Sequence, residues 1–122
     1  MSDRTLKKGN GWRIGWNPTT EVYKGLVGGD NWAIELTEAE FNDFCRLLEQ
    51  LTQTINGIAG ELMDEERIAC EAESKLLWLE VEGYSHDYSL RLILNQGRCC
   101  EGNWSQEAVV ELVQAAQTLK VF

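Results

Sequence analysis

Apolar residues recur at alternating steps of three and four through the middle of the chain, from Phe41 to Leu62. This spacing is that of one face of an α-helix. Just before it, Thr37 and Glu40 have the spacing of a capping box, and Leu36 and Phe41 occupy the two positions of a hydrophobic staple. We therefore expect a long helix that starts after Thr37 and packs against a β-sheet, with a coiled-coil seam as the alternative.

A second helix is expected near the C-terminus, because the same features recur there. Trp104 precedes a Ser105 cap, and Val109 stands at the staple position. The apolar face of this helix would consist of Val109, Leu112, Val113, Ala116 and Leu119. Each predicted helix thus follows a strand through a junction of the same kind.

Between the two helices the apolar residues alternate, which predicts strands with one buried face. Residues 77–84 and 88–94 have the pattern of a hairpin, and further strands are expected at residues 68–73 and 98–101. In residues 77–84 the leucines and the valine share one face, whereas Trp78, Tyr84 and two glutamates share the other. The outward side of this sheet is therefore expected to be acidic.

The N-terminal part predicts three strands, at residues 11–16, 22–27 and 32–36, with turns at Asn17-Pro18 and Gly28-Gly29. The expected order is three strands and a helix, then four strands and a helix, which is a near-duplication. The fold class is α+β, with a curved antiparallel sheet or sheets backed by two helices. The chain length of 122 residues fits a single domain over residues 1–122.

Charge is distributed unevenly along the chain, whose formal net charge is −9. Residues 1–30 carry five basic and three acidic side chains, a balance of +2, whereas residues 31–122 carry six basic and seventeen acidic ones, a balance of −11. Because an acidic body repels phosphate backbones, the charge disfavours nucleic-acid binding outside the N-terminal segment.

The cysteine and histidine content gives no support to a metal or cofactor site. Cys45, Cys70, Cys99 and Cys100 contain no Cys-x-x-Cys pair, and His86 is the single histidine. The start of the chain is polar, and no apolar run is long enough to span a membrane. We therefore expect a cytoplasmic protein with reduced cysteines, without membrane contact, metal or cofactor.

No catalytic constellation is recognisable either. Glu80 and Glu82 would lie on the same side of an open strand, where both carboxylates are solvated. His86 stands with an aspartate and serines in a hairpin loop, and adjacency in sequence does not give the geometry of a catalytic triad. Vicinal Cys99 and Cys100 would point to opposite faces of a strand, which leaves one of them buried. We do not expect an enzyme.

Four blocks of the sequence resemble a small protein family of cyanobacteria, the domain of unknown function 1818. The blocks are Gly11–Trp16 (GWRIGW), Trp32–Thr37 (WAIELT), Leu77–Gly83 (LWLEVEG) and Glu101–Trp104 (EGNW). The resemblance covers almost the whole chain and implies no biochemical activity. That family's fold is similar to the single-stranded-DNA-binding fold of the plant Whirly proteins and of the eukaryotic coactivator positive cofactor four. The resemblance therefore implies a Whirly-like fold, and a transcription-related DNA-binding role only by analogy.

Aromatic and basic side chains interleave in the N-terminal strands, a pattern used by surfaces that stack single-stranded bases. The candidate binding residues are Trp12, Arg13, Trp16, Tyr23 and Lys24, together with Trp78 and Tyr84 from the later hairpin. If Trp12, Trp16 and Trp78 shared an open face, they would mark a partner surface.

The favoured hypothesis is a non-catalytic binding module for a protein partner or for a second copy of the chain. The apolar stripe from Phe41 to Leu62 is the basis for expecting a homo-oligomer. Single-stranded nucleic-acid binding through the N-terminal aromatic and basic strands is the alternative.

Overall fold

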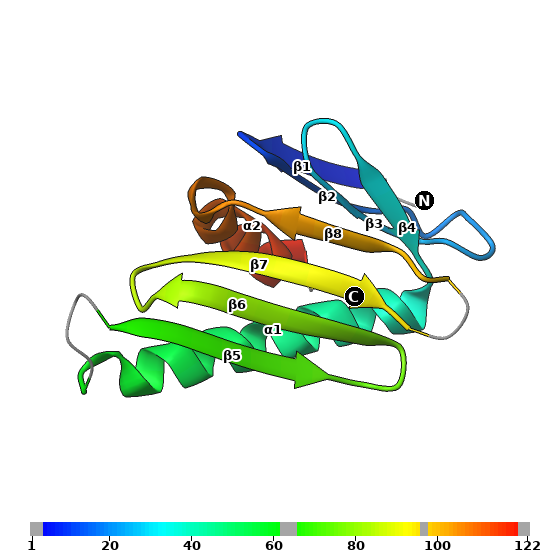
Figure 1. Cartoon of the computed structure of the whole chain (residues 1–122). Helices are drawn as coiled ribbons and strands as arrows, with labels where there is room; N and C mark the ends of the chain where they lie inside the picture. The colour runs from blue at the N-terminus through cyan, green and yellow to red at the C-terminus, as the bar shows by residue number, and fades with distance from the viewer. Residues whose placement is uncertain (1–3, 62–65, 96–97, 120–122) are drawn as a thin grey trace.

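Two antiparallel sheets of four strands, each followed by a helix, make up residues 4–61, 66–95 and 98–119, which the computed structural model describes (Figure 1). The N-terminal sheet contains β1 (Thr5–Gly9), β2 (Trp12–Trp16), β3 (Gly25–Gly28) and β4 (Ala33–Leu36), and α1 (Glu38–Ala59) follows. The C-terminal sheet contains β5 (Arg67–Glu73), β6 (Leu77–Tyr84), β7 (Asp87–Leu94) and β8 (Glu101–Trp104), and α2 (Gln106–Leu119) follows. The α+β class is confirmed, and the duplication is more complete than the sequence indicated.

The expected order lacks strand β1, so the prediction of three strands before α1 is wrong. β1 lies at the edge of its sheet and pairs only with β2 among the described strands. Its residues are mostly polar, because an edge strand with one exposed face needs few apolar side chains. The signal for it is the Asn10-Gly11 dipeptide, which is typical of a tight hairpin turn. Gly11 has the positive φ, 82°, that such a turn requires.

Two other strands begin later than expected. β3 starts at Gly25, so Val22, Tyr23 and Lys24 belong to the preceding loop and not to a strand at 22–27. β8 starts at Glu101, so the strand expected at 98–101 is misplaced by three residues. Cys99 has a φ of 51°, a left-handed backbone conformation that a strand cannot contain.

Helix α1 begins with the predicted capping box. Thr37 Oγ1 accepts a hydrogen bond from the Glu40 amide at 3.1 Å, and Glu40 Oε1 accepts one from the Thr37 amide at 2.8 Å. The apolar stripe of α1 is buried within the chain from Phe41 to Ile55 and half-buried at Ile58, and the helix contacts β5 and β6 most extensively. The sheet-packed helix is therefore confirmed over the coiled-coil seam, and the buried stripe no longer supports dimerisation. Its last position, Leu62, lies outside the described residues.

Both helices lie behind the sheets in Figure 1, and each contacts strands of both. The predicted apolar face of α2 is buried, apart from the half-buried Val113. In the described part of the chain, neither helix is long and apolar enough to cross a membrane.

An aromatic cluster joins the two sheets at the ends of β4 and β8. The indole nitrogen of Trp104 donates a hydrogen bond to the carbonyl oxygen of Gly28 at 2.8 Å, within the buried core. The Trp104 ring centroid lies 5.1 Å from that of Trp32 and 6.0 Å from that of Phe44. Gly102 leaves the space that the Trp32 ring fills, since a Cβ there would lie 2.2 Å from the ring. The resulting core draws residues from both sheets and both helices.

The contact between Gly25 and Phe41 gives a test of this packing. A Cβ at Gly25 would lie 2.5–2.8 Å from three atoms of the fully buried Phe41 side chain. We expect Gly25→Ala to lower the free energy of unfolding by about 1–3 kcal/mol, because Phe41 must shift within a packed core.

The matched control is Gly57→Ala on the exposed side of α1, where an added Cβ meets nothing within 4 Å. It should raise the free energy of unfolding by up to about 1 kcal/mol, since alanine favours helix more than glycine does. Urea titrations followed by tryptophan fluorescence measure both. A Gly25→Ala protein as stable as the parent would contradict the packing described.

Candidate interaction surface

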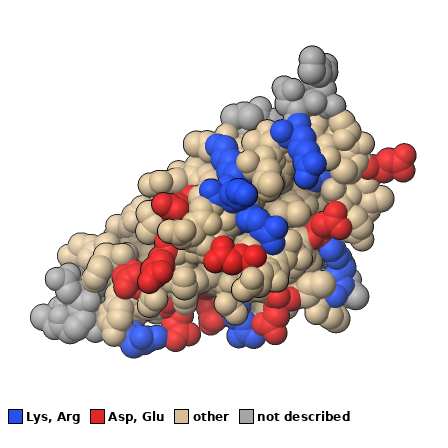
Figure 2. Space-filling view, turned by 90° about the horizontal axis from the view of Figure 1, so that it is seen from above, with Lys and Arg blue, Asp and Glu red and all other residues tan. Residues whose placement is uncertain are grey.

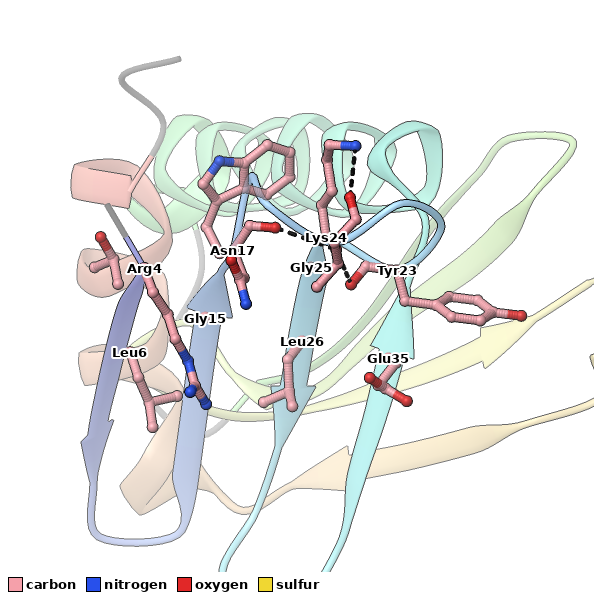
Figure 3. A pocket seen from close by; sticks show the side chains of 12 residues that line it. Arg4, Leu6, Gly15, Asn17, Tyr23, Lys24, Gly25, Leu26 and Glu35 are labelled. Carbon is pink, nitrogen blue, oxygen red and sulfur yellow. Dashed lines mark hydrogen bonds between the residues drawn. The ribbon is translucent and has the colours of Figure 1, made fainter. Parts of the chain in front are cut away.

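The side of the N-terminal sheet that faces away from the helices is called here the outer face. Its residues are Leu6, Lys8, Arg13, Gly15, Leu26, Gly28, Ala33 and Glu35, which alternate with the buried residues of the same strands. The strand register places Leu6, Gly15, Leu26 and Glu35 in one row across the four strands. Figure 3 shows these four residues side by side, with the helices behind the sheet.

A hollow of about 100 Å³ opens in this face over Gly15. Because Gly15 has no side chain, the Leu6 side chain lies close to its backbone, and a Cβ there would be 3.1 Å from Leu6 Cδ1. Leu6 is 50% exposed and Tyr23 is 40% exposed, and both line the hollow. Among the described residues, two other large hydrophobic side chains are comparably exposed: Val22 beside Tyr23, and Val110 on α2.

Charged side chains of both signs surround the hollow. Arg4 and Lys24 line it from one side of the sheet and from the β2–β3 loop, and Glu35 lines it from β4. Lys24 Nζ donates a hydrogen bond to the Thr20 carbonyl oxygen at 3.0 Å, which holds the loop. Seen from above, the molecule shows a band of Lys and Arg side chains with Asp and Glu side chains around it (Figure 2). The lining of the hollow itself combines Leu6, Gly15 and Leu26 with charged residues of both signs.

The outward side of the C-terminal sheet differs in kind, although it belongs to an equivalent unit. Its carboxylates are those of Glu71, Glu73, Glu80, Glu82, Asp87 and Glu101, against the guanidinium groups of Arg67 and Arg91. Glu71 and Glu80 stand directly opposite each other on β5 and β6. Like charges in such a pair are unfavourable unless water hydrates them. This side is therefore suited to contact with solvent.

The tryptophans of β2 do not lie on an open face. Trp12 is only 7% exposed, and its indole nitrogen donates to Glu111 Oε1 on α2 at 2.8 Å. Trp16 points to the same side of β2, and its ring centroid lies 5.4 Å from that of Phe41. The idea that Trp12, Trp16 and Trp78 share an open face is therefore wrong. Alternation along β2 turns both of its tryptophans toward the helices, whereas Trp78 lies on the other sheet.

Arg13 is directed outward but is engaged with its own sheet. Its Nε donates to the Gly29 carbonyl oxygen at 2.9 Å, and its Nη2 donates to the Trp32 carbonyl oxygen at 2.8 Å. Both acceptors belong to the turn between β3 and β4, so the Arg13 guanidinium stabilises that turn. A phosphate group would have to compete with these bonds for it.

Trp78 and Tyr84 lie on the outward side of β6, and each carries an arginine on its ring. Arg91 Cζ is 5.9 Å from the Trp78 centroid, and Arg67 Cζ is 5.6 Å from the Tyr84 centroid. A hydrogen bond with Tyr84, assisted by the nearby Glu82 carboxylate, raises the pKa of the Arg67 guanidinium. These two rings are distant in the fold from the hollow, which they do not line.

Of the seven predicted binding residues, three line the hollow: Trp16, Tyr23 and Lys24. Sequence patterns did not identify Arg4, Leu6, Gly15, Leu26 and Glu35, which complete its centre and rim. Four of these five lie on four different strands and Arg4 precedes β1, so only the strand register brings them together.

The residues considered for catalysis lie apart. His86 is exposed in the β6–β7 turn, 6.5 Å from the Tyr84 ring. Cys99 is exposed, and half-buried Cys100 donates through Sγ to the Arg98 carbonyl oxygen at 3.2 Å. Both cysteines precede β8, so the expectation that they point to opposite faces of a strand does not apply. Within the described ranges, no three His, Cys, Asp or Glu residues are grouped so that they could hold a metal ion.

Arg98 connects the loop before β8 to the site. Its Nη1 lies 2.5 Å from Glu40 Oε1, its Nη2 donates to the Glu35 carbonyl oxygen, and its Cζ lies 4.7 Å from the Tyr23 ring centroid. The Glu40 side chain is 7% exposed and that of Arg98 is 25% exposed. The ion pair thus fixes Tyr23, the end of β4 and the start of α1 relative to one another.

Removal of this arginine should be costly for stability. Arg98→Ala leaves the buried Glu40 carboxylate without its cation, and we expect a loss of about 1–3 kcal/mol in the free energy of unfolding. This range is less than that of a fully buried pair, because Arg98 is partly hydrated. Arg91→Ala is the control: it breaks a pair with Glu101 whose side chains are 48% and 58% exposed. That loss should stay below about 1 kcal/mol. Guanidinium titrations measure the free energy of unfolding of both variants. Equal losses in the two variants would contradict the claim that Arg98 stabilises the buried Glu40 carboxylate.

Comparisons with known proteins agree with the fold and add no activity. None of the curated proteins compared with the chain matches it. A crystal structure of a protein with unknown function, from the DUF155 family of Prochlorococcus sp. NATL2A, is similar with a TM-score of 0.88 and 28% sequence identity. The match covers 94% of this chain and 98% of that one. The likeness to Whirly proteins stays a prediction. Residues 7–119 match the family described as Domain of unknown function (DUF1818), and the chain therefore belongs to this family.

Proposed function

We propose that the chain is a non-catalytic binding module that holds a protein partner on the outer face of its N-terminal sheet. The observation that carries this proposal is the uncovered apolar surface of that face, where Leu6 on edge strand β1 is 50% exposed beside the hollow over Gly15. An exposed apolar patch with a charged rim is typical of protein interaction sites, because contact with a partner removes the patch from water.

The contrast between the two sheets supports the same proposal. The same two helices pack against both sheets, so each sheet has one face that the helices leave uncovered. The C-terminal sheet carries six carboxylates and two guanidinium groups on its outward side, whereas the outer face of the N-terminal sheet carries Lys8, Arg13 and Glu35 among leucines, glycines and an alanine. Packing of the core does not require Leu6 or Ala33 to be apolar, since both are exposed. Contact with a partner, which removes these side chains from water, accounts for their apolar character.

We place this module in the cytoplasm. No disulfide joins the cysteines of the described residues, and Cys99 is exposed as a thiol. Exposed thiols persist where the surroundings are reducing.

The alternative, binding of single-stranded nucleic acid, receives less support from the geometry. Such surfaces need aromatic rings on which bases stack. Trp12 is buried under α2, and Trp16 packs toward Phe41, so the rings of β2 face the core. Among the described aromatic residues, Tyr23 is the ring beside the hollow that is exposed by more than a third, and Arg98 already lies over it.

Affinity capture from an extract of the source cells tests the proposed function. With the purified chain as bait, we expect a bound protein that is lost with Leu6→Glu, because a carboxylate buried in the interface costs several kcal/mol. Val110→Glu is the control, since Val110 is 59% exposed and lies on α2, away from the outer face. Both variants should keep the parental melting temperature. A protein captured equally by all three baits would speak against this face.

A gel shift with unstructured oligonucleotides tests the alternative. At low salt we expect no saturable shift, because the chain has a net charge of −9 and the two rings of β2 pack toward the core, with Trp12 buried and Trp16 half-buried. A salt-sensitive shift that Arg13→Ala abolishes would overturn the preference for a protein partner. Lys75→Ala, on the exposed β5–β6 turn, is the charge-matched control.

A further inference from the structure

We propose that the free edge of β1 binds an extended peptide segment of a protein partner, in which an apolar side chain stands between two acidic ones at alternate positions. This inference rests on the proposed function and names the chemistry of its partner. Addition of an extended segment to a sheet edge is a recurring mode of peptide recognition, in which main-chain hydrogen bonds give affinity and alternate side chains give specificity. Three features of β1 support it: its free backbone groups, the groove beside it and the order of its outward side chains.

The backbone groups of Leu6 and Lys8 point to the free edge of β1. Residues 10–11 form a two-residue turn, so the flanking pair of Gly9 and Trp12 is hydrogen-bonded, and bonded and non-bonded pairs alternate from there. Leu6 and Lys8 belong to the non-bonded pairs, whose N–H and C=O groups are directed away from β2. Among the described residues, no backbone hydrogen bond outside the strand ladders involves either of them. An added strand can therefore bond to both residues.

An open groove of about 590 Å³ lies between β1 and α2. Residues 8–10 line it from the hairpin, and the exposed Gln114 lines it from α2. Gly9 contributes no side chain, and a Cβ there would lie 2.7 Å from Glu111 Oε1 on α2. The groove thus leaves room beside β1 for the side chains of an added strand that point toward the helix.

Two hydrogen bonds between the hairpin and α2 fix the width of this groove. Trp12 Nε1 donates to Glu111 Oε1 at 2.8 Å, and Lys7 Nζ donates to Thr118 Oγ1. Glu111 and Thr118 both line the groove, about two helical turns or 10 Å apart. This length corresponds to about three residues of an extended chain. A short extended segment therefore fits along β1 better than a helix or a folded surface does.

The outward side chains along this edge follow the order basic, apolar, basic. Arg4, Leu6 and Lys8 are all exposed, and Figure 3 shows the Arg4 and Leu6 side chains close together on the β1 side of the sheet. A strand that pairs with β1 places its own outward side chains about 5 Å from these, where opposite charges stabilise the pair. The complementary segment is therefore acidic, apolar, acidic at alternate positions, and both strand directions satisfy this order.

The same order disfavours a second copy of β1 as the added strand. In an antiparallel pair centred on Leu6, Arg4 of each copy would lie beside Lys8 of the other, and like charges directly opposite each other are destabilising. Lysines on edge strands commonly prevent pairing with identical strands. Arg13 stands opposite Lys8 on β2 and adds positive charge there. The edge therefore favours an acidic segment over its own copy.

Fluorescence anisotropy with a labelled synthetic peptide tests the proposal. The probe contains threonines, a central valine and a glutamate two positions to either side of it. At low salt we expect saturable binding that Leu6→Glu abolishes and that the double variant Arg4→Glu with Lys8→Glu weakens at least about tenfold. Lys75→Glu, on the exposed β5–β6 turn, should bind the probe like the parent chain.

Two further peptides test the order and the sign of the charges. A peptide with its glutamates directly next to the valine turns them toward α2 and Glu111, so it should bind about tenfold more weakly. A peptide with lysines in place of the glutamates should bind the double variant more tightly than it binds the parent chain. Equal affinity of the parent chain for all three peptides would overturn the proposed chemistry.

Amide hydrogen exchange locates the added strand. The amides of Leu6 and Lys8 should exchange at least about tenfold more slowly when the probe is bound, because the probe supplies their acceptors. The Lys7 amide already bonds to β2 in the ladder and should change little. Binding that leaves the exchange of Leu6 and Lys8 unchanged would overturn the edge as the site.

The inference and the proposed function can fail separately. Absence of saturable binding up to millimolar probe overturns the inference. If Leu6→Glu still abolishes capture of a protein from the extract, the binding module stands with a partner that contacts the outer face in another way. If neither probe binding nor Leu6-dependent capture occurs, both are overturned.

Discussion

The buried hydrogen bond from the Trp104 indole to the Gly28 carbonyl oxygen is the contact on which the arrangement of the two sheets depends. It joins the end of the last strand to the end of β3, and the rings of Trp32 and Phe44 enclose it. A hydrogen bond sealed from water holds its partners in register more strictly than apolar contact does, because misalignment leaves a buried polar group unsatisfied. The two repeats therefore share one core instead of forming two.

The sequence predicted those structural features that depend on residues only a few positions apart. The Thr37 and Glu40 capping box, the alternation of residues 77–84 and the face of α2 were all predicted, because each depends on periodicity or on neighbours three positions apart. The start of β8 was misplaced because Cys99 has a left-handed backbone conformation, which a cysteine side chain does not predict. Edge strand β1 was not predicted because it contains few apolar residues.

The site depended on information that a linear pattern does not hold. Trp12 and Trp16 could face either side of their strand, and the choice is made by which side α2 and Phe41 cover. The hollow over Gly15 exists because Leu6, Leu26 and Glu35 fall into one row, and that row follows from three strand registers. Tyr23 and Lys24 were predicted as binding residues because aromatic and basic side chains interleave there, although they were expected on a strand; both line the hollow from the loop before β3. The outward faces of the two equivalent sheets carry different side chains, because the fold does not determine which residues occupy its exposed positions.

Glu40 closes the capping box of α1 and also pairs with Arg98, 58 positions further along the chain. The Trp104 bond to Gly28 spans 76 positions. Both contacts complete the first repeat with residues from the end of the second. During synthesis the first repeat therefore lacks these two contacts until nearly the whole chain has left the ribosome. Folding of the complete core depends on these contacts between residues far apart in the sequence. Until then, the first sheet lacks the contacts that Arg98 and Trp104 make with it.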